Sequence, residues 1–313
     1  MSLVVVGSVA LDSLETPFGR RDEVLGGSAS YFSTCAAFFG PVRAVAVVGD
    51  DFPAAHLEFL ASRGVDVRGV ARRPGRTFRW KGRYELDLNV AHTLDTQLNV
   101  FAEFRPDLPA ACRDSEYVFL GNIDPDLQGQ VLDQVRAPRF VGLDTMNYWI
   151  TSKKGSLLRT LERVDMAFVN EAEARQLAEE PSVVRAAERI LGMGPKALVV
   201  KRGEYGALLF SRGGVFAAAA LPLSGVLDPT GAGDSFAGGF MGYLARTGRE
   251  DEDALRRATV LGSVLASYAV EGFSLDRLRT LTAAEIRDRY AQARQLVQFP
   301  DLEDGALGDA TSS

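Results

Sequence analysis

Short apolar runs alternate with helical patterns along most of this chain. The runs are rich in Val, Leu, Ile and Phe and lack the polar alternation of a half-wet strand. They are Leu3–Val6, Ala44–Val48, Tyr117–Leu120, Phe140–Leu143, Met166–Val169 and Ala197–Val200. Such runs are typical of strands that are buried on both faces of a parallel sheet.

Helical patterns fill the intervals between these runs. They are Ser28–Phe39, Pro53–Arg63, Asp126–Val135, Ser156–Val164, Glu171–Ala178 and Val183–Leu191. Pro53 at a helix start and Gly64 just past its end follow the usual placement of these residues. The alternation predicts an α/β fold with a doubly wound, mostly parallel sheet flanked by helices.

The rhythm breaks first after residue 70. Thr77–Glu85 alternates polar and apolar residues, which predicts an antiparallel strand with one wet face. Thr96–Phe101 is the expected partner strand, and Ser13–Phe18 is expected to join them. We therefore predict a small β-lid from about residues 12–20 and 72–104, with a surface hairpin of no function as the alternative.

A second break precedes the C-terminal helices. Gly206–Leu209 and Val215–Ala219 predict a hairpin, and three long helical patterns follow. These helices are Gly233–Arg246, Glu252–Tyr268 and Ala283–Leu296. Residues 1–298 are expected to form the folded unit, and residues 299–313 an acidic, disordered tail.

Composition narrows the class of protein. Hydrophobic residues make up 46% and charged residues 24% of the 313 residues, which is ordinary for a globular protein. No apolar run approaches the roughly 18 residues of a membrane span, and the N-terminus lacks the basic start of a signal peptide, so we expect a cytoplasmic protein. A net charge of −6 without a long basic run argues against nucleic-acid binding. With only Cys35, Cys112 and two histidines, a metal centre built from these residues is not expected.

The turn Asp228–Phe236 carries the most chemical information. Gly231, Ala232 and Gly233 let backbone N–H groups approach an anion at the start of a helix. Asp234 lies in the same turn, where a carboxylate suits proton transfer during phosphoryl transfer. The alternative is that Asp234 only stabilises the helix dipole.

The sequence Asp-Pro-Thr-Gly-Ala-Gly-Asp of this turn resembles the C-terminal signature of the ribokinase-like (PfkB-type) carbohydrate kinases. The resemblance extends to about residue 298. It implies an ATP-dependent kinase that phosphorylates a sugar hydroxyl, with Asp234 as the general base and Gly231, Ala232 and Gly233 as the anion hole. It also implies a lid that closes over the sugar and that forms a dimer interface in several members.

The resemblance assigns the acceptor side to residues near the N-terminus and at two strand ends. Asp12 matches an acidic residue that binds two sugar hydroxyls, and Gly26 and Gly27 match a Gly-Gly pair that approaches them. Asn122 and Asp144 follow two core strands and are expected to face the same pocket. Near Asp144 the sequence departs from the family, since Tyr148-Trp149 replaces the usual Arg.

The remaining matches lie on the expected ATP side. Asn170 and Glu173 resemble a magnesium-associated motif, although a helix cap with first-turn acids fits them equally well. The expected nucleotide residues are Asn170, Lys201, Gly203, Gly206 and Thr230. Val226–Thr230 and Tyr268–Phe273 match segments that bind a monovalent cation such as K⁺ in some relatives. Val48-Gly49-Asp50-Asp51-Phe52 also resembles a family element, which we interpret as structural.

Several alternatives remain at this stage. Nucleosides compete with free sugars as the acceptor, because the lid aromatics Phe78, Trp80, Tyr84 and Phe101 are able either to stack on a base or to pack within the lid. A non-catalytic sensor of nucleotide or sugar is a further alternative, which Asp234 argues against. A dinucleotide-binding dehydrogenase and a P-loop kinase are disfavoured, because the third glycine of the first and the Gly-Lys-Ser/Thr of the second are absent.

Overall fold

A nine-stranded sheet forms the centre of the computed structural model, which describes residues 1–303. The strand order within these residues is β13-β12-β11-β10-β9-β8-β1-β4-β5. All neighbours are parallel except β11–β12 and β12–β13. The strands are β1 (Leu3–Val6), β4 (Val42–Gly49), β5 (Val65–Arg73), β8 (Tyr117–Leu120), β9 (Phe140–Asp144), β10 (Met166–Asn170), β11 (Ala197–Lys201), β12 (Ala207–Ser211) and β13 (Gly214–Ala218). The predicted doubly wound, mostly parallel α/β fold is confirmed.

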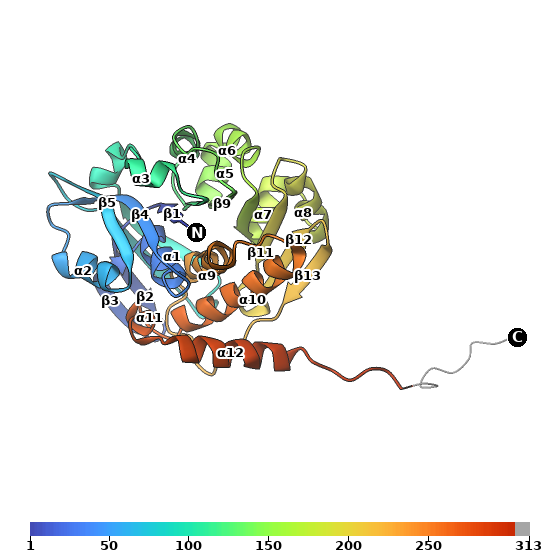
Figure 1. Cartoon of the computed structure of the whole chain (residues 1–313). Helices are drawn as coiled ribbons and strands as arrows, with labels where there is room; N and C mark the ends of the chain where they lie inside the picture. The colour runs from blue at the N-terminus through green and yellow to red at the C-terminus, as the bar shows by residue number, and fades with distance from the viewer. Residues whose placement is uncertain (304–313) are drawn as a thin grey trace, which may run out of the picture.

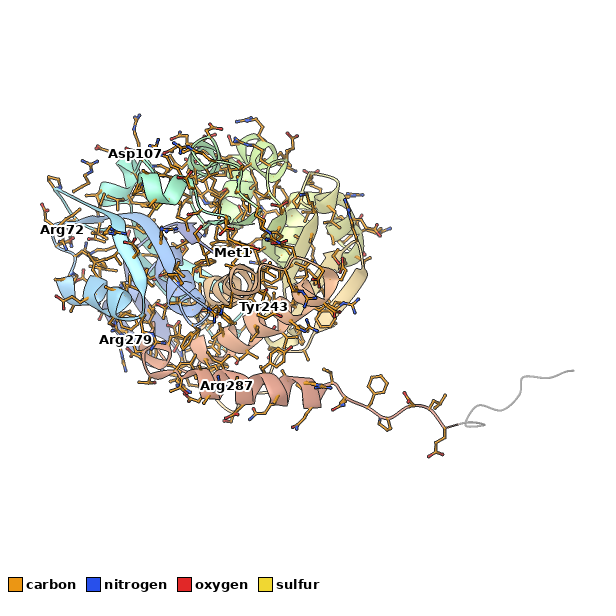
Figure 2. All side chains as sticks on the ribbon, in the orientation of Figure 1. Met1, Arg72, Asp107, Tyr243, Arg279 and Arg287 are labelled. Atoms are coloured by element: carbon orange, nitrogen blue, oxygen red, sulfur yellow. The ribbon has the colours of Figure 1, made fainter. Side chains whose placement is uncertain are left out.

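Helices cover both faces of this sheet, and each face has its own apolar core. One face carries α1 (Ser28–Ala36), α2 (Ala54–Ser62), α9 (Ala232–Thr247), α10 (Glu252–Ala269), α11 (Asp276–Thr280) and α12 (Ala283–Leu296). The other carries α3 (Ala110–Arg113), α4 (Pro125–Leu132), α5 (Asn147–Ser152), α6 (Lys154–Leu161), α7 (Glu171–Ala178) and α8 (Val183–Leu191). The green helices α3, α4 and α6 and the orange α9 and α10 lie on opposite sides of the sheet (Figure 1), and side chains fill the space between the layers (Figure 2).

The chain order changes direction at β1. From β1 the sheet continues through β4 and β5 on one side and through β8, β9 and β10 on the other. In open α/β sheets, ligands bind at such a switch point, outside the carboxyl ends of the strands. A ligand-binding site is therefore expected at the segments that follow β1 and β8.

A second, four-stranded sheet is built from two hairpins. Its order is β3-β2-β6-β7, with strands β2 (Ala10–Thr16), β3 (Gly19–Gly26), β6 (Arg79–Tyr84) and β7 (Ala91–Gln97). The pairs β2–β3 and β6–β7 are antiparallel, and β2–β6 is parallel. We call it the small sheet.

The predicted partner strand Thr96–Phe101 is wrong in its bounds. The partner of β6 is β7, which ends at Gln97. A 3₁₀ helix, η1 (Asn99–Glu103), follows it, and Asn99 has a positive φ of 49°, which breaks the extended backbone. Phe101 stacks between Phe78 and Phe104, so these aromatics pack at the base of the small sheet.

Asp51 fixes the point where the chain enters β6. Its Oδ1 accepts hydrogen bonds from both the backbone N–H and the hydroxyl of Thr77, each at 2.7 Å, and its Oδ2 pairs with Arg79 at 2.8 Å. Thr77 Oγ1 in turn accepts from the Gly49 N–H at 3.0 Å. The structural interpretation of the Gly49-Asp50-Asp51 segment agrees with these contacts.

Glycines allow α9 to pack closely between α1 and α10. A Cβ at Gly238 would lie 2.4 Å from the Phe32 carbonyl oxygen on α1. A Cβ at Gly239 would lie 2.7 Å from Leu265 on α10, and one at Gly242 would lie 2.7 Å from Phe39. Close packing between helices is therefore what these glycines provide.

Two sequence-based expectations concern a membrane span and the C-terminal tail. No helix within residues 1–303 is long and apolar enough to cross a membrane. Residues 299–303 of the predicted tail are exposed and lack regular secondary structure, and positions 304–313 lie outside the described residues.

Candidate active site

The turn before α9 presents backbone N–H groups to the carboxyl edge of the sheet. Gly231 has a φ of 75°, and a Cβ there would lie 2.4 Å from the ring of Tyr31, so only glycine fits. The Ala232 N–H donates to the Pro229 carbonyl at 3.2 Å. In the described part of the chain, the N–H groups of Gly231, Gly233 and Asp234 have no backbone acceptor, which suits binding of an anion.

Asp228 holds this turn in place. It is fully buried, its Oδ1 accepts from the Thr230 N–H and its Oδ2 from the Ser274 N–H, both at 2.9 Å. The Leu227 N–H also donates to the Val270 carbonyl at 2.8 Å. The two segments considered for a monovalent cation therefore lie side by side. Asp228 belongs to the sequence motif, but the motif alone gives it no role, because only the fold brings Ser274 beside it.

Lys201 lies at the centre of a cluster of carboxylates. Its Nζ is 2.7 Å from Asp144 Oδ2, across the end of β10. A Cβ at Gly233 would lie 3.0 Å from the same Nζ, so the ammonium sits against the turn before α9. Burial disfavours the charged lysine, but the carboxylates of Asp144, Glu173 and Asp234 together hold the pKa of Lys201 above its usual value.

Glu173 forms the capping box of α7 with Asn170. The Asn170 side chain accepts from the Glu173 N–H at 2.8 Å, and Glu173 Oε2 accepts from the Asn170 N–H at 2.7 Å. The helix-cap alternative is thus present in the structure. The box uses one oxygen of a buried carboxylate that also faces Lys201, so Oε1 remains available.

Asp12, the residue predicted to bind the acceptor, is buried at the start of the small sheet. It lies on β2, just beyond the carboxyl end of β1, and is 4% exposed. A Cβ at Gly26 would lie 1.9 Å from Asp12 Oδ2, and one at Gly27, where φ is 89°, would lie 2.5 Å from the Ser8 carbonyl oxygen. The Gly-Gly pair is therefore required by the position of this carboxylate and by the backbone path into α1.

Asn122 and the unusual loop after β9 are joined to each other. The Trp149 indole N–H donates to Asn122 Oδ1 at 3.0 Å, and Tyr148 packs edge-on against Trp149. Tyr148 is 59% exposed. Tyr148-Trp149 thus provides an aromatic wall, held by Asn122, in place of the usual Arg.

The loop Lys201–Gly206 follows β11 and turns through η2 (Gly203–Tyr205). A Cβ at Gly206 would lie 2.1 Å from the Ala218 carbonyl oxygen, so this glycine serves the approach of β13. A Cβ at Gly203 would lie 1.8 Å from Oδ1 of Asn89, a residue of the β6–β7 turn. Gly203 therefore faces the small sheet, a contact that the sequence did not indicate.

Burial perturbs three carboxyl groups of this site. It raises the pKa of Asp12, Glu173 and Asp234 to about 7 each. For Asp234, burial is followed by the charge of Asp144, which raises the pKa further, while Lys201 lowers it. A carboxyl group that titrates near neutrality, beside free N–H groups and an ammonium, is suited to general acid–base chemistry on an anionic substrate.

Known proteins resemble this chain over most of its length. The family model described as "pfkB family carbohydrate kinase" matches residues 6–276. A cytidine kinase from Thermococcus kodakarensis is 33% identical over 262 residues, which span 82% of this chain and 92% of that protein.

Solved structures show the same fold. The Burkholderia thailandensis nucleoside kinase in complex with inosine superposes with a TM-score of 0.76 at 21% identity, covering 93% of this chain and 96% of that one. The Salmonella enterica aminoimidazole riboside kinase, with aminoimidazole riboside and an ATP analogue, gives a TM-score of 0.76 at 19% identity and covers 93% and 100%. At this level of identity the likeness concerns the fold.

The raised carboxyl pKa values predict how stability depends on pH. Between its ordinary value of 3.8 and about 7, the folded Asp12 keeps a proton that the unfolded chain releases, so stability falls as pH rises through this window. Asp12→Asn removes this loss. We expect its melting temperature to exceed that of the wild type by a few degrees at pH 8 and by less at pH 5, in thermal unfolding without ligands.

Asp66 provides a control of opposite sign, because hydrogen bonds from Arg68 lower its pKa to about 2. Asp66→Asn should leave the melting temperature at pH 8 unchanged or slightly lower, since this pair lies at the surface. A melting temperature of Asp12→Asn below that of the wild type at pH 8 would show that the buried, ionised Asp12 does not destabilise the folded protein.

Proposed function

Because the chain belongs to the pfkB family of carbohydrate kinases, we propose that it transfers the γ-phosphoryl group of ATP to a hydroxyl group of a nucleoside. The observation that carries the choice of acceptor is the 33% identity to a cytidine kinase over 92% of that protein's length. Cytidine is therefore the first acceptor to test, and a free pentose is the alternative.

Asp12 is proposed to hold the acceptor. A buried carboxylate accepts two hydrogen bonds well from neighbouring hydroxyls, such as the 2′ and 3′ hydroxyls of a ribose. Binding of these two groups leaves the primary hydroxyl as the one to be phosphorylated. The aromatic wall of Tyr148 and Trp149, at the adjacent strand end, is suited to contact a base.

Asp234 is proposed to accept the proton of that hydroxyl. As the hydroxyl oxygen bonds to the γ-phosphorus, the bond from phosphorus to the β,γ-bridging oxygen breaks and ADP leaves. A base that titrates near pH 7 is half ionised at neutral pH and is therefore matched to this transfer. The charge of Asp234 acts on Asp12, which supports the proposal that both carboxyl groups face one substrate.

The turn before α9 and Lys201 are proposed to stabilise the transferring phosphoryl group. The N–H groups of Gly231 and Gly233 and the N-terminus of α9 supply fixed dipoles, and the Lys201 ammonium lies against Gly233. Gly203 and Thr230 border the same cleft, where we propose that they line the nucleotide.

Magnesium fits this site through few protein contacts. Within residues 1–303 there is no group of three or more His, Cys, Asp or Glu side chains arranged to hold a metal ion. Mg²⁺ keeps several waters and binds substrate phosphates, so a single carboxylate is sufficient. The capping box uses Oε2 of Glu173. We propose that Glu173, through Oε1, and Asn170 would hold water molecules bound to Mg²⁺. The ion would neutralise charge on the phosphates.

Two further expectations stay predictions. A monovalent cation would bind between Val226–Thr230 and Tyr268–Phe273. A homodimer would form through the small sheet, whose edge strand β7 is exposed along its whole length.

The wild-type protein is expected to consume ATP in the presence of cytidine and to form a monophosphate. Asp234→Asn should lower kcat by about 10²–10⁴-fold, because the base is lost while the shape of the turn is kept. Coupled ADP assays over cytidine, uridine, adenosine, inosine and ribose measure turnover by the wild type and the variant. Calorimetric titration measures the binding of ATP to each.

Asp253→Asn is the matched control, since Asp253 is also a first-turn acid but lies on the exposed end of α10. It should retain wild-type kcat. Near-wild-type turnover by Asp234→Asn would contradict the assignment of the base. Turnover of ribose alone would replace the nucleoside as acceptor, and no turnover with any acceptor would overturn the proposed kinase reaction.

Glu173→Gln separates the metal role from the capping role. Glutamine can still complete the capping box, so the melting temperature should not fall below that of the wild type. The half-saturating Mg²⁺ concentration at fixed ATP should rise by about tenfold if Glu173 binds water of the metal. An unchanged Mg²⁺ titration would mean that Glu173 serves the helix alone.

A further inference from the structure

The β6–β7 hairpin of the small sheet contacts two loops of the large sheet. Tyr84, the last residue of β6, is 8% exposed, and its Oη accepts a hydrogen bond from Thr230 Oγ1 at 3.2 Å. Thr230 belongs to the turn that precedes α9. The small sheet is thus bonded directly to the proposed phosphoryl-transfer turn.

The Tyr84 side chain is buried, and the charges of three carboxylates act on its hydroxyl. Burial, followed by the charges of Asp228, Asp12 and Asp234, raises the pKa of this phenol, so it stays protonated at neutral pH. Since Thr230 donates the one hydrogen bond found for Tyr84 Oη within residues 1–303, the Tyr84 hydrogen remains available to a ligand. Tyr84 therefore contacts the turn and keeps its own hydrogen for a further partner.

The tip of the same hairpin touches the loop Lys201–Gly206. Asn89 Oδ1 occupies the space in which a Cβ of residue 203 would stand, at 1.8 Å from that position. The tip is shaped by Asp87, whose Oδ1 accepts from the Asn89 N–H at 3.0 Å and whose carbonyl accepts from the Val90 N–H. Gly203, with a φ of 55°, therefore contacts the tip of the hairpin directly.

We propose that Tyr84 and Asn89 are positioning residues that latch the small sheet onto the two nucleotide-side loops, so that acceptor and ATP bind cooperatively. The inference rests on the proposed function for the identity of the two ligands. The acceptor is held from the small sheet by Asp12 on β2, and β2 pairs directly with β6. A ligand that fixes either side of the cleft therefore favours the hairpin position that the other ligand needs.

The size of the effect follows from the contacts. Thermodynamic linkage requires that ATP tighten acceptor binding by the same factor by which the acceptor tightens ATP binding. A neutral hydrogen bond such as Tyr84–Thr230 corresponds to about three- to tenfold in this coupling. The hairpin contacts therefore act mainly on the coupling and less on the affinity for either ligand alone.

Calorimetry measures the coupling directly. The dissociation constant of cytidine is determined without and with a saturating non-hydrolysable ATP analogue, in wild type, Tyr84→Phe and Asn89→Ala. The ratio of the constant without the analogue to that with it should be at least about three- to tenfold in the wild type and fall toward one in each variant. Cytidine binding without the analogue should change less than threefold.

Two control variants match these changes. Tyr243→Phe removes the hydroxyl of Tyr243, a residue of α9 that is labelled in Figure 2. The ring of Tyr243 packs edge-on against Phe39. Leu86→Ala truncates a side chain that is 89% exposed on the same hairpin turn as Asn89. Both should keep the wild-type ratio. A ratio of one in the wild type, or a wild-type ratio in Tyr84→Phe and Asn89→Ala, would overturn the latch.

Hydrogen exchange provides a readout that does not depend on the acceptor. The ATP analogue alone should slow exchange of the backbone amides of residues 85–90 in the wild type and not in Asn89→Ala. If this protection is found although no acceptor is phosphorylated, the latch stands and the proposed reaction falls. If the analogue binds and exchange at the tip is unchanged, the latch is overturned whatever the acceptor.

Discussion

The site depends on the interaction of the Lys201 ammonium with three carboxylates. Asp144, Glu173 and Asp234 converge at the carboxyl ends of β9, β10 and β11, and Lys201 is the cation whose charge acts on all three. Removing one partner of such a buried pair leaves an uncompensated charge, which costs far more than an exposed pair contributes. The same ammonium lies 3.0 Å from the position of a Cβ at residue 233, so the glycine of the turn allows the lysine of β11 to approach it closely.

Close packing carries this arrangement to the rest of the fold. Gly238, Gly239 and Gly242 set α9 tightly between α1 and α10, and this fixes where its N-terminus meets the sheet. Asp228 then ties the turn to Ser274, and Tyr84 ties it to the small sheet. The turn therefore contacts both the Lys201 cluster, through Gly233, and the small sheet, which carries Asp12. The charge of Asp234 acts on both Asp12 and Lys201.

Local pattern was sufficient to predict some elements and insufficient for others. The bounds of β1, β8, α7, α8 and α12 agree with the sequence prediction, because their apolar periodicity is strong and bounded by clear capping or turn residues. The edge strand β5 and the strand β7 were not predicted in place, since charged residues interrupt the apolar positions of β5 and β7 is exposed along its whole length. Likewise, the motif pointed to Asp234 and Gly231, whereas Asp228, Tyr84 and Asn89 take their roles from partners distant in sequence.

The central claim is that a nucleoside hydroxyl reaches Asp234 while Asp12 holds the ribose. A crystal structure with cytidine and a non-hydrolysable ATP analogue tests it most directly. The account predicts two ribose hydroxyls on the Asp12 carboxylate and the primary hydroxyl oxygen within about 2.6–3.2 Å of an Asp234 oxygen, facing the γ-phosphorus. A ribose bound away from Asp12, or a γ-phosphate remote from Gly231–Gly233 and Lys201, would contradict it.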